Sequence, residues 1–193
     1  MTDLPSWYPD PLENKPAPMP LLRVQAFLNT RDLEDNVDRL ADSAGAREWL
    51  IDAGVLGPDT PVSAAELEVA REIRDCLRSL LETAGEGGEL PAAELDALRR
   101  LAAGHSARLT VGDGGALGLE CAGGGSLGDG LFELVMIIRE AQEDGSWSRM
   151  KMCANPDCRW VFYDRSRNQH GNWCNMAVCG NRLKNRQLRA RRR

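Results

Sequence analysis

The chain has 193 residues, of which 42% are hydrophobic and 27% charged, a composition ordinary for a soluble globular protein of one medium domain or one domain plus a small module. No run approaches the roughly 18 apolar residues that a membrane span needs, and the first twenty residues lack a basic-then-apolar signal pattern, so we expect a cytoplasmic protein with no membrane partner. The net charge of −5 divides unevenly, because residues 149–193 hold twelve Lys or Arg against two Asp or Glu (+10) and residues 1–148 hold the balance of −15.

The first part of the chain reads as a proline-rich lead-in followed by helices. Six of the first twenty residues are proline, so residues 1–19 are expected to form a flexible lead-in, with Trp7 and Tyr8 as candidates for docking on the body. Apolar residues at helical spacing predict helices over about 20–29, 46–54, 63–85 and 91–104. Ser63 and Glu66 form a capping box at the start of the third of these helices.

The pattern changes after residue 106. Short alternating runs on either side of a Gly-Asp-Gly-Gly turn predict a β-hairpin within residues 107–125. A nearly all-apolar helix over 126–145 is expected to be buried on most sides at the centre of the first domain. A strand near 147–153 then leads into the next module without a flexible linker. Cys76 and Cys121 are expected to be small buried residues.

Four cysteines near the end of the chain form two pairs. Cys153 and Cys158 are separated by four residues, as are Cys174 and Cys179, and fifteen residues lie between the pairs. Two ligands close in sequence can share one turn and face one ion, and Zn²⁺ takes four thiolates tetrahedrally. Because four thiolates fill that coordination sphere and leave no position for water or substrate, we predict one structural Zn²⁺.

These cysteines could also serve in other ways. His170, four residues before Cys174, is an alternative ligand, and an iron–sulfur cluster is an alternative metal group. A redox dithiol fits the spacing poorly, and paired spacing ahead of a basic helix favours zinc. We therefore expect an α+β chain with a mainly helical domain that carries a β-hairpin over 20–146. A small treble-clef or ribbon-like zinc finger that ends in a basic helix is expected over 147–193.

A run of arginines follows the last cysteine in the sequence GNRLKNRQLRARRR. Four of them share one face of the expected helix, and the helix has too few aliphatic residues to dock on its own domain. Nucleic acid is the polyanion that would complete it, and the alternative is a solvated tail held against the acidic body. The candidate nucleic-acid contacts are Arg165, Arg167, Asn168, Arg182, Lys184, Arg186, Arg189 and Arg193.

Two stretches of the sequence resemble known families. The pattern C-x₄-C, F-x-D-R-S-R-N and W-C-x-M-x-x-C-G-N-R, here from Cys153 to Arg182, resembles the CGNR zinc finger. VQAFLNT at 24–30, REWL at 47–50 and EIRDCLRSLL at 72–81 resemble the ABATE domain that usually precedes it. The resemblance implies a stress-induced transcription regulator whose finger binds DNA. The sequence departs from the family at residues 169–172, where basic residues are usual and Gln-His-Gly-Asn carries no fixed positive charge.

Three functions compete at this stage. The first is a DNA-binding transcription regulator whose N-terminal domain senses a signal or mediates dimerisation. The second is a zinc-stabilised protein-interaction module whose basic helix docks on an acidic partner. The third is an enzyme, which is not expected, because no nucleophile–base motif or phosphate loop is present. A small-molecule effector, if one exists, would use polar and aromatic residues of the ABATE-like stretches, namely Asn29, Thr30, Arg47 and Trp49.

Overall fold

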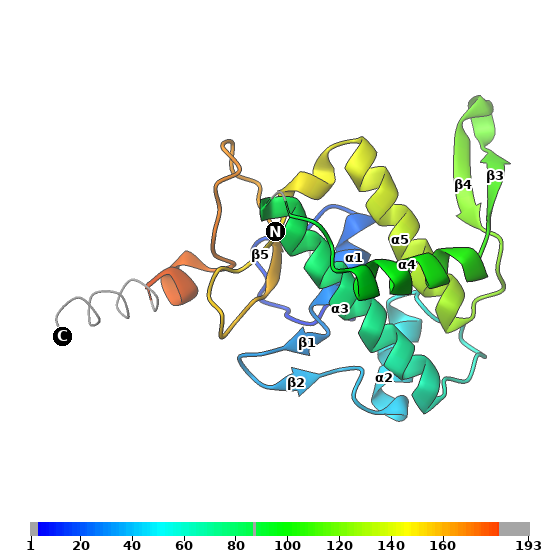
Figure 1. Cartoon of the computed structure of the whole chain (residues 1–193), viewed down its shortest axis with the longest axis horizontal. Helices are drawn as coiled ribbons and strands as arrows, with labels where there is room; N and C mark the ends of the chain where they lie inside the picture. The colour runs from blue at the N-terminus through cyan, green and yellow to red at the C-terminus, as the bar shows by residue number, and fades with distance from the viewer. Residues whose placement is uncertain (1–3, 87, 182–193) are drawn as a thin grey trace.

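Helices make up the body of the protein. The computed structural model describes residues 4–86 and 88–181, and within these ranges five α-helices surround one core (Figure 1). They are α1 (Leu21–Leu28), α2 (Ser43–Asp52), α3 (Ala64–Glu86), α4 (Ala92–Gly104) and α5 (Leu127–Glu143). These bounds agree closely with the helices expected from the apolar periodicity. A mainly helical body was also part of the expected α+β fold.

Side-chain caps explain where the two longest helices begin. The Ser63 N–H donates to Glu66 Oε2 at 2.8 Å and the Glu66 N–H donates to Ser63 Oγ at 3.2 Å, so the predicted capping box opens α3. Ser126 and Asp129 form the same reciprocal pair at the start of α5. Each box satisfies backbone donors that the first helical turn leaves without partners.

Helix α5 lies at the centre of the body. Its residues Leu131, Leu134 and Ile138 are almost completely buried, whereas the opposite side is only half-buried. Gly130 allows this close approach, because a Cβ at that position would lie 1.7 Å from the carbonyl oxygen of Val55. The expected central helix is confirmed. Gly130 allows the chain that follows α2 to approach α5 closely.

Three antiparallel strand pairs complete the described elements. The pair β1 (Arg31–Asp32) with β2 (Val37–Asp38) follows α1 and was not expected from the sequence. The predicted hairpin is β3 (Ala107–Val111) with β4 (Leu117–Cys121), and it projects from one end of the molecule (Figure 1). The pair β5 (Met150–Met152) with β6 (Val161–Tyr163) begins the cysteine module at the other end. Cys76 is buried as expected, and Cys121 is half-buried.

A buried ion pair ties α3 to β2. The Arg74 side chain is completely buried, and its guanidinium donates to both carboxylate oxygens of Asp38 at 2.7 and 2.8 Å. The same guanidinium donates to Thr30 Oγ1 at 3.0 Å. Burial alone would raise the pKa of Asp38, but the hydrogen bonds from Arg74 and from the Leu40 N–H, together with the charges of Arg74 and Arg31, lower that pKa.

The proline-rich segment is packed rather than free. We call residues 4–20 the N-terminal strap. Tyr8 is 4% exposed, and the Trp49 Nε1–H donates to the Trp7 carbonyl at 2.7 Å, so the two aromatic residues dock on the body. Further along the strap, the Tyr163 N–H donates to the Lys15 carbonyl at 2.9 Å, so the strap also lies along β6. The flexible lead-in expected from its six prolines is therefore not what the structure contains.

One hydrophobic core runs across the expected domain boundary at residue 146. Trp147, Met150, Val161 and Tyr163 belong to the same buried cluster as α1 and α5. A second, smaller cluster contains Cys153, Cys158, Phe162 and Cys179. The division into residues 20–146 and 147–193 stays a prediction, and any motion between the two parts would have to break a shared core.

Replacing Arg74 with Met is expected to lower the free energy of unfolding by about 3–5 kcal/mol, because Asp38 would be left as a partly buried charge without its partner. Equilibrium denaturation in urea measures the change. Arg99→Met is the matched control, since the Arg99–Asp96 ion pair is exposed and its loss should change stability by less than about 0.5 kcal/mol. Equal effects of the two variants would show that the buried pair has no special role.

Candidate metal centre

The first cysteine pair lies on a tight turn after β5. The Cys153 N–H donates to the Trp160 carbonyl at 2.9 Å, which continues the β5–β6 pairing by one residue. The Cys158 N–H donates to the Asn155 carbonyl at 3.0 Å and folds the Asn-Pro-Asp turn back. Arg159 has a φ of +50°, which reverses the chain into β6. Both sulfurs therefore come from one hairpin end.

The second pair lies on a short helical turn. The Asn175 side chain accepts hydrogen bonds from the Ala177 and Val178 N–H groups and caps the turn η3 (Met176–Gly180). The Cys179 N–H donates to the Asn175 carbonyl at 2.9 Å, so Cys174 and Cys179 face the same side. Gly180 leaves room for Met176, whose Sδ would lie 2.5 Å from a Cβ at that position.

The four cysteine sulfurs form one cluster. All the Sγ atoms lie within 4.8 Å of one another, and the Cys158–Cys174 and Cys174–Cys179 separations are both 3.7 Å. Four thiolates at about 2.3 Å around one tetrahedral Zn²⁺ would be about 3.8 Å apart, whereas a disulfide requires about 2.05 Å. Three of the four residues are buried and the fourth is half-buried. The cluster therefore fits one structural zinc ion.

The chemistry of the cluster also favours a cation. In the metal-free cluster, hydrogen bonds from Cys158 and Cys174 lower the pKa of Cys153 to about 2. The hydrogen bond with Cys153 raises the pKa of Cys158 to about 12 and also raises that of Cys174. The ionised Cys153 thus opposes the ionisation of Cys158 and Cys174. A divalent cation removes the opposition, because each thiolate then faces positive charge.

One polar side chain supports the cluster from outside. Asn155 is 2% exposed, and its Nδ2–H₂ group lies 3.8 Å from Cys179 Sγ, where it can donate to a thiolate. The sequence showed Asn155 only as a turn residue. His170 is exposed and lies outside the cluster, so it is not a ligand among the described residues.

Buried amides attach the finger to the helical body. Asn29, at the end of α1, donates from Nδ2 to the Val161 carbonyl at 2.8 Å and accepts at Oδ1 from the Val161 N–H at 2.8 Å. Gln25, one turn earlier, donates to the same carbonyl at 3.1 Å. Asn29 thus pairs with Val161 as a neighbouring strand would. We call these contacts the α1–β6 joint.

A buried arginine extends this joint. Arg78 of α3 is 7% exposed and donates to the Leu28 carbonyl and to the Arg159 carbonyl, each at 2.7 Å. Burial lowers the pKa of Arg78 to about 10, so the guanidinium stays charged at neutral pH. Because Arg159 follows Cys158 directly, Arg78 fixes the backbone next to a zinc ligand.

The residues suggested for an effector pocket are engaged within the chain. Asn29 belongs to the α1–β6 joint, and the Thr30 hydroxyl donates to the Phe27 carbonyl and accepts from Arg74. Arg47 donates to the carbonyls of residues 58 and 60, and Trp49 donates to the strap. Their polar groups serve the fold, and we propose no ligand site on them.

The loop between the cysteine pairs carries the described candidates for nucleic-acid contact. Arg165, Arg167 and Asn168 are exposed, and the loop extends away from the helical body (Figure 1). Asp164 closes the loop by accepting from the Ser166 N–H at 3.0 Å and the Gly171 N–H at 2.7 Å. Burial would raise the pKa of Asp164, but these hydrogen bonds and Lys151 lower it to about 2.

The arginines of the finger differ in whether they have partners within the protein. Arg165 donates to the Pro16 carbonyl at 2.7 Å, and Arg159 pairs with Glu82 at 2.6 Å. Within residues 4–86 and 88–181, Arg167 has no hydrogen bond or ion pair. Five predicted contacts lie outside the described residues, namely Arg182, Lys184, Arg186, Arg189 and Arg193.

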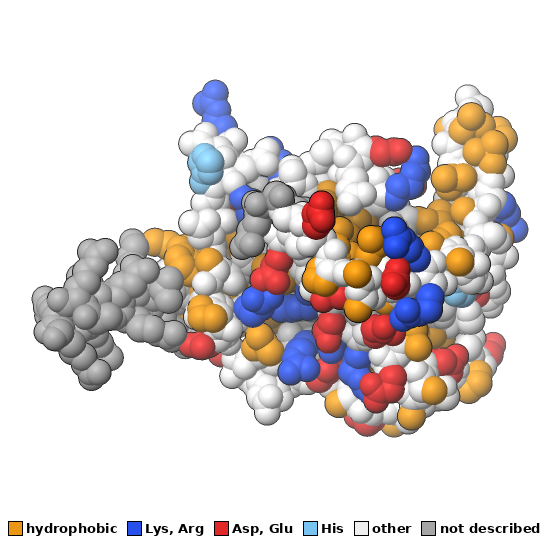
Figure 2. Space-filling model, viewed as in Figure 1, with side chains coloured by type: hydrophobic (Ala, Val, Ile, Leu, Met, Phe, Trp, Pro, Cys, Tyr) orange, Lys and Arg blue, Asp and Glu red, His pale blue; other side chains and the backbone are white. Residues whose placement is uncertain are grey.

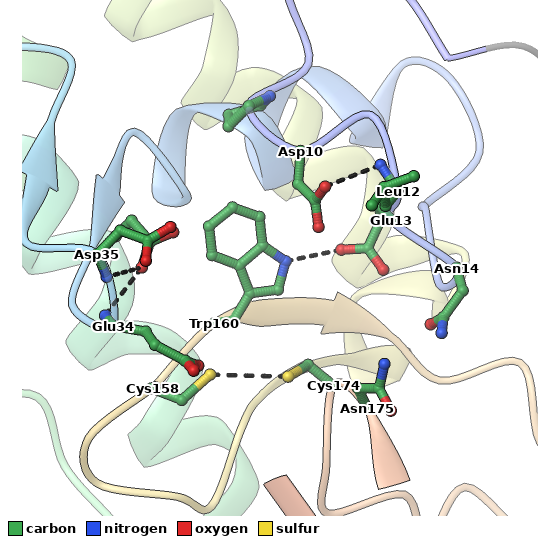
Figure 3. A pocket seen from close by; sticks show the side chains of 12 residues that line it. Asp10, Leu12, Glu13, Asn14, Glu34, Asp35, Cys158, Trp160, Cys174 and Asn175 are labelled. Atoms are coloured by element: carbon green, nitrogen blue, oxygen red, sulfur yellow. Dashed lines mark hydrogen bonds between the residues drawn. The ribbon is translucent and has the colours of Figure 1, made fainter. Parts of the chain in front are cut away.

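An acidic cavity of about 340 Å³ borders the cluster on one side (Figure 3). Cys158 and Cys174 lie on one wall, and carboxylates from the strap and from the β1–β2 turn form the others. Trp160 lies among them and donates from Nε1 to Glu13 Oε2 at 2.7 Å. The five acidic residues of this cavity are Asp10, Glu13, Asp32, Glu34 and Asp35. Their charge makes this side unfavourable for a polyanion.

The two cysteine-bearing turns and the sulfur cluster define a zinc-finger protein in which a four-cysteine site is attached to a helical body. Residues 149–192 match the family model of the CGNR zinc finger, and residues 23–142 match that of ABATE, described as “Putative stress-induced transcription regulator”. Since the latter match covers more than half of the 193 residues, the chain belongs to the ABATE family. A comparison with curated proteins finds no match. Among the described residues, none of the helices has the length and apolarity required to cross a membrane.

Replacing Cys158 with Ser is expected to reduce the zinc content from about one ion per chain to near zero after dialysis against a mild chelator, because a hydroxyl is a far weaker zinc ligand than a thiolate. Elemental analysis of the purified chain measures the ratio. Cys121→Ser is the control, since Cys121 lies outside the cluster. A full equivalent of zinc in the Cys158 variant would show that the ligand set is wrong.

Replacing Asn29 with Ala is expected to lower the free energy of unfolding of the zinc-bound protein by about 1–3 kcal/mol, because the Val161 N–H and C=O would lose buried partners. Zinc transfer to a chelator should also become faster, since the joint holds the strand that follows Cys158. Urea denaturation and a chelator dye give the two readouts. Asn168→Ala, at an exposed position, should leave both unchanged. Zinc release at the wild-type rate in the Asn29 variant would separate the joint from the metal site.

Proposed function

We propose that this protein is a DNA-binding transcription regulator. In this proposal the zinc ion fixes the finger, and the loop between the cysteine pairs together with the basic C-terminal segment contacts nucleic acid. The helical domain senses a signal or mediates dimerisation. The role is regulatory rather than catalytic, the protein acts in the cytoplasm, and the description of its family associates it with stress.

The charge distribution carries the proposal. Residues 149–193 hold a net +10, whereas the remainder of the chain holds −15. A polyanion attracted to the first region is repelled by the second, so an encounter would favour one orientation. Association with DNA through such a basic region depends mainly on phosphate contacts and is therefore sensitive to salt.

The surroundings of the finger support a direction of approach. The acidic cavity beside Cys158 and Cys174 disfavours contact from that side. Arg167 lies on the projecting loop without an internal partner among the described residues, which leaves its guanidinium available for a phosphate. Trp160 donates to Glu13 within the acidic cavity, so we assign it to packing and not to nucleic acid.

If about five of the eight candidate residues meet phosphates, the slope of log K against log salt should lie near −4 to −5 on random duplex DNA. Fluorescence anisotropy with a labelled duplex over a range of salt concentrations measures the slope. Zinc-loaded full-length chain is used throughout. No binding at low salt, or an affinity that does not depend on salt, would contradict the proposal.

Charge reversal identifies which cations are responsible. The triple variant with Arg182, Arg186 and Arg189 changed to Glu should weaken binding by at least a hundredfold, because three phosphate contacts become repulsive. A control variant with Arg99, Arg100 and Arg139 changed to Glu makes the same change in net charge at exposed positions of the body. Equal loss in both variants would mean that net charge, and not the C-terminal segment, determines binding.

A second function remains in competition because of the acidic cavity. Its carboxylates show that this chain itself presents a surface suited to a basic segment. A protein-interaction module would use its basic end to dock on such a surface of a partner or a neighbouring subunit. Partners that stay bound in a lysate after nuclease treatment, and are lost in the triple Glu variant, would favour this reading over DNA binding.

A further inference from the structure

The β3–β4 hairpin has one apolar face. Its register pairs Leu109 with Leu119 and Val111 with Leu117. Side chains alternate between the two faces of a strand, and directly paired residues share a face. These four aliphatic side chains therefore lie on the same face of the hairpin, and we call it the aliphatic face.

The aliphatic face is exposed to solvent. Leu109 is 64% exposed, Val111 and Leu117 are each 70% exposed, and Leu119 is 38% exposed. The hairpin stands away from the helices (Figure 1), and hydrophobic side chains cover much of it in the view of Figure 2. In an antiparallel sheet with one apolar face, that face normally packs on a core. An isolated two-stranded hairpin is also marginally stable in water, and no element within residues 4–86 and 88–181 covers this face.

The opposite face shows that the exposed apolar side is not an accident of composition. It carries Arg108 and Glu120, which pair across the strands at 3.4 Å, and Thr110 beside Gly118. Charge is thus confined to one face and neutralised there. The aliphatic face has no charge with which to recognise nucleic acid or a charged peptide, so its partner must offer apolar surface.

The base of the hairpin is held in place. His105 Nδ1 lies 3.0 Å from Asp129 Oδ1, and the His105 ring stacks on Phe132 of α5. Asp129 also closes the capping box with Ser126, so the hairpin begins from a fixed helix terminus. A presented face whose base is already ordered loses less conformational entropy on association than a free loop would.

We propose that the aliphatic face binds the same face of a second copy of this chain and forms a two-fold symmetric dimer. The two cross-strand pairs make the face nearly uniform in shape, and the absence of charge means that a copy turned by 180° meets no like-charge repulsion. A second copy also supplies an uncovered apolar ribbon of matching length. This inference specifies the dimerisation role given above and does not depend on DNA binding.

The available area fits a weak, transient dimer. The four aliphatic side chains expose on the order of 400 Å² per copy, a size at which apolar patches on monomers are often functional. Face-to-face pairing would remove about 800 Å² in total from these side chains. Specific stable interfaces bury about 1,200–2,000 Å², so this total is that of a weak, transient contact, and the dimer should dissociate on dilution.

Sedimentation of the zinc-loaded full chain over a hundredfold range of concentration tests the proposal in the absence of DNA. The wild type should move from monomer to dimer. The double variant Val111→Thr, Leu117→Thr should raise the dissociation constant at least tenfold, because it places hydroxyls on the two most exposed side chains of the aliphatic face. Threonine retains strand propensity and a favourable cross-strand pair, so the hairpin itself is preserved.

A matched control changes the other face. Arg108→Gln with Glu120→Gln removes the exposed ion pair of the hairpin and should leave the dissociation constant within twofold of the wild type. Circular dichroism verifies that all three proteins are folded. A wild type that stays monomeric, or a threonine variant that dimerises normally, would overturn the proposal. Binding of a monomeric wild type to neutral phosphatidylcholine vesicles would assign the face to a lipid surface instead.

Discussion

The attachment of strand β6 to helix α1 is the constraint on which the finger depends. Asn29 bonds to both backbone groups of Val161, and Gln25 shares the carbonyl. These amides are buried, so each would lose a partner without replacement if the two parts separated. Arg78 then fixes the carbonyl of Arg159, next to Cys158. The metal site is thus held in orientation by the helical body as well as by its own sulfurs. A shift of α1 or α3 would therefore move the backbone next to Cys158.

Charged residues are also distributed unevenly around the finger. Carboxylates of the strap and of the β1–β2 turn gather beside the sulfur cluster, whereas the projecting loop presents Arg167 away from them. The hairpin, with its uncharged face, lies at the opposite end of the long axis from the finger (Figure 1). Pairing through the hairpins would leave both fingers on the outside of a dimer. Each could then meet a separate stretch of nucleic acid, in the manner of regulators that read two half-sites.

Local patterns in the sequence predicted what local chemistry determines. Helix periodicity, the box at Ser63 and Glu66 and the spacing of the cysteines each depend on residues a few positions apart, and the structure agrees with all three. Asn29 lies where the predicted helix over 20–29 ends, but its bonds to Val161 and the bond between Glu13 of the strap and Trp160 were not predicted, because these partners lie more than a hundred residues apart in the chain. An amide at a helix end looks the same in sequence whether it terminates the helix or grips a distant strand. The prolines of the strap likewise suggested a flexible segment. Proline restricts the local backbone, but its presence in the sequence does not show which part of the protein the segment packs against.

The strap and the α1–β6 joint set an order for synthesis. Helix α1 and the strap leave the ribosome before residues 161–163, which satisfy Gln25, Asn29 and the Lys15 carbonyl. Until those last segments emerge, the nascent body must keep these polar groups hydrated beside an apolar core that lacks Trp147, Met150 and Val161. Domains usually fold as they are completed, but here completion of the first depends on the second. Zinc binding by the four cysteines, which are made after the helical body, is therefore positioned to accompany the closure of the shared core.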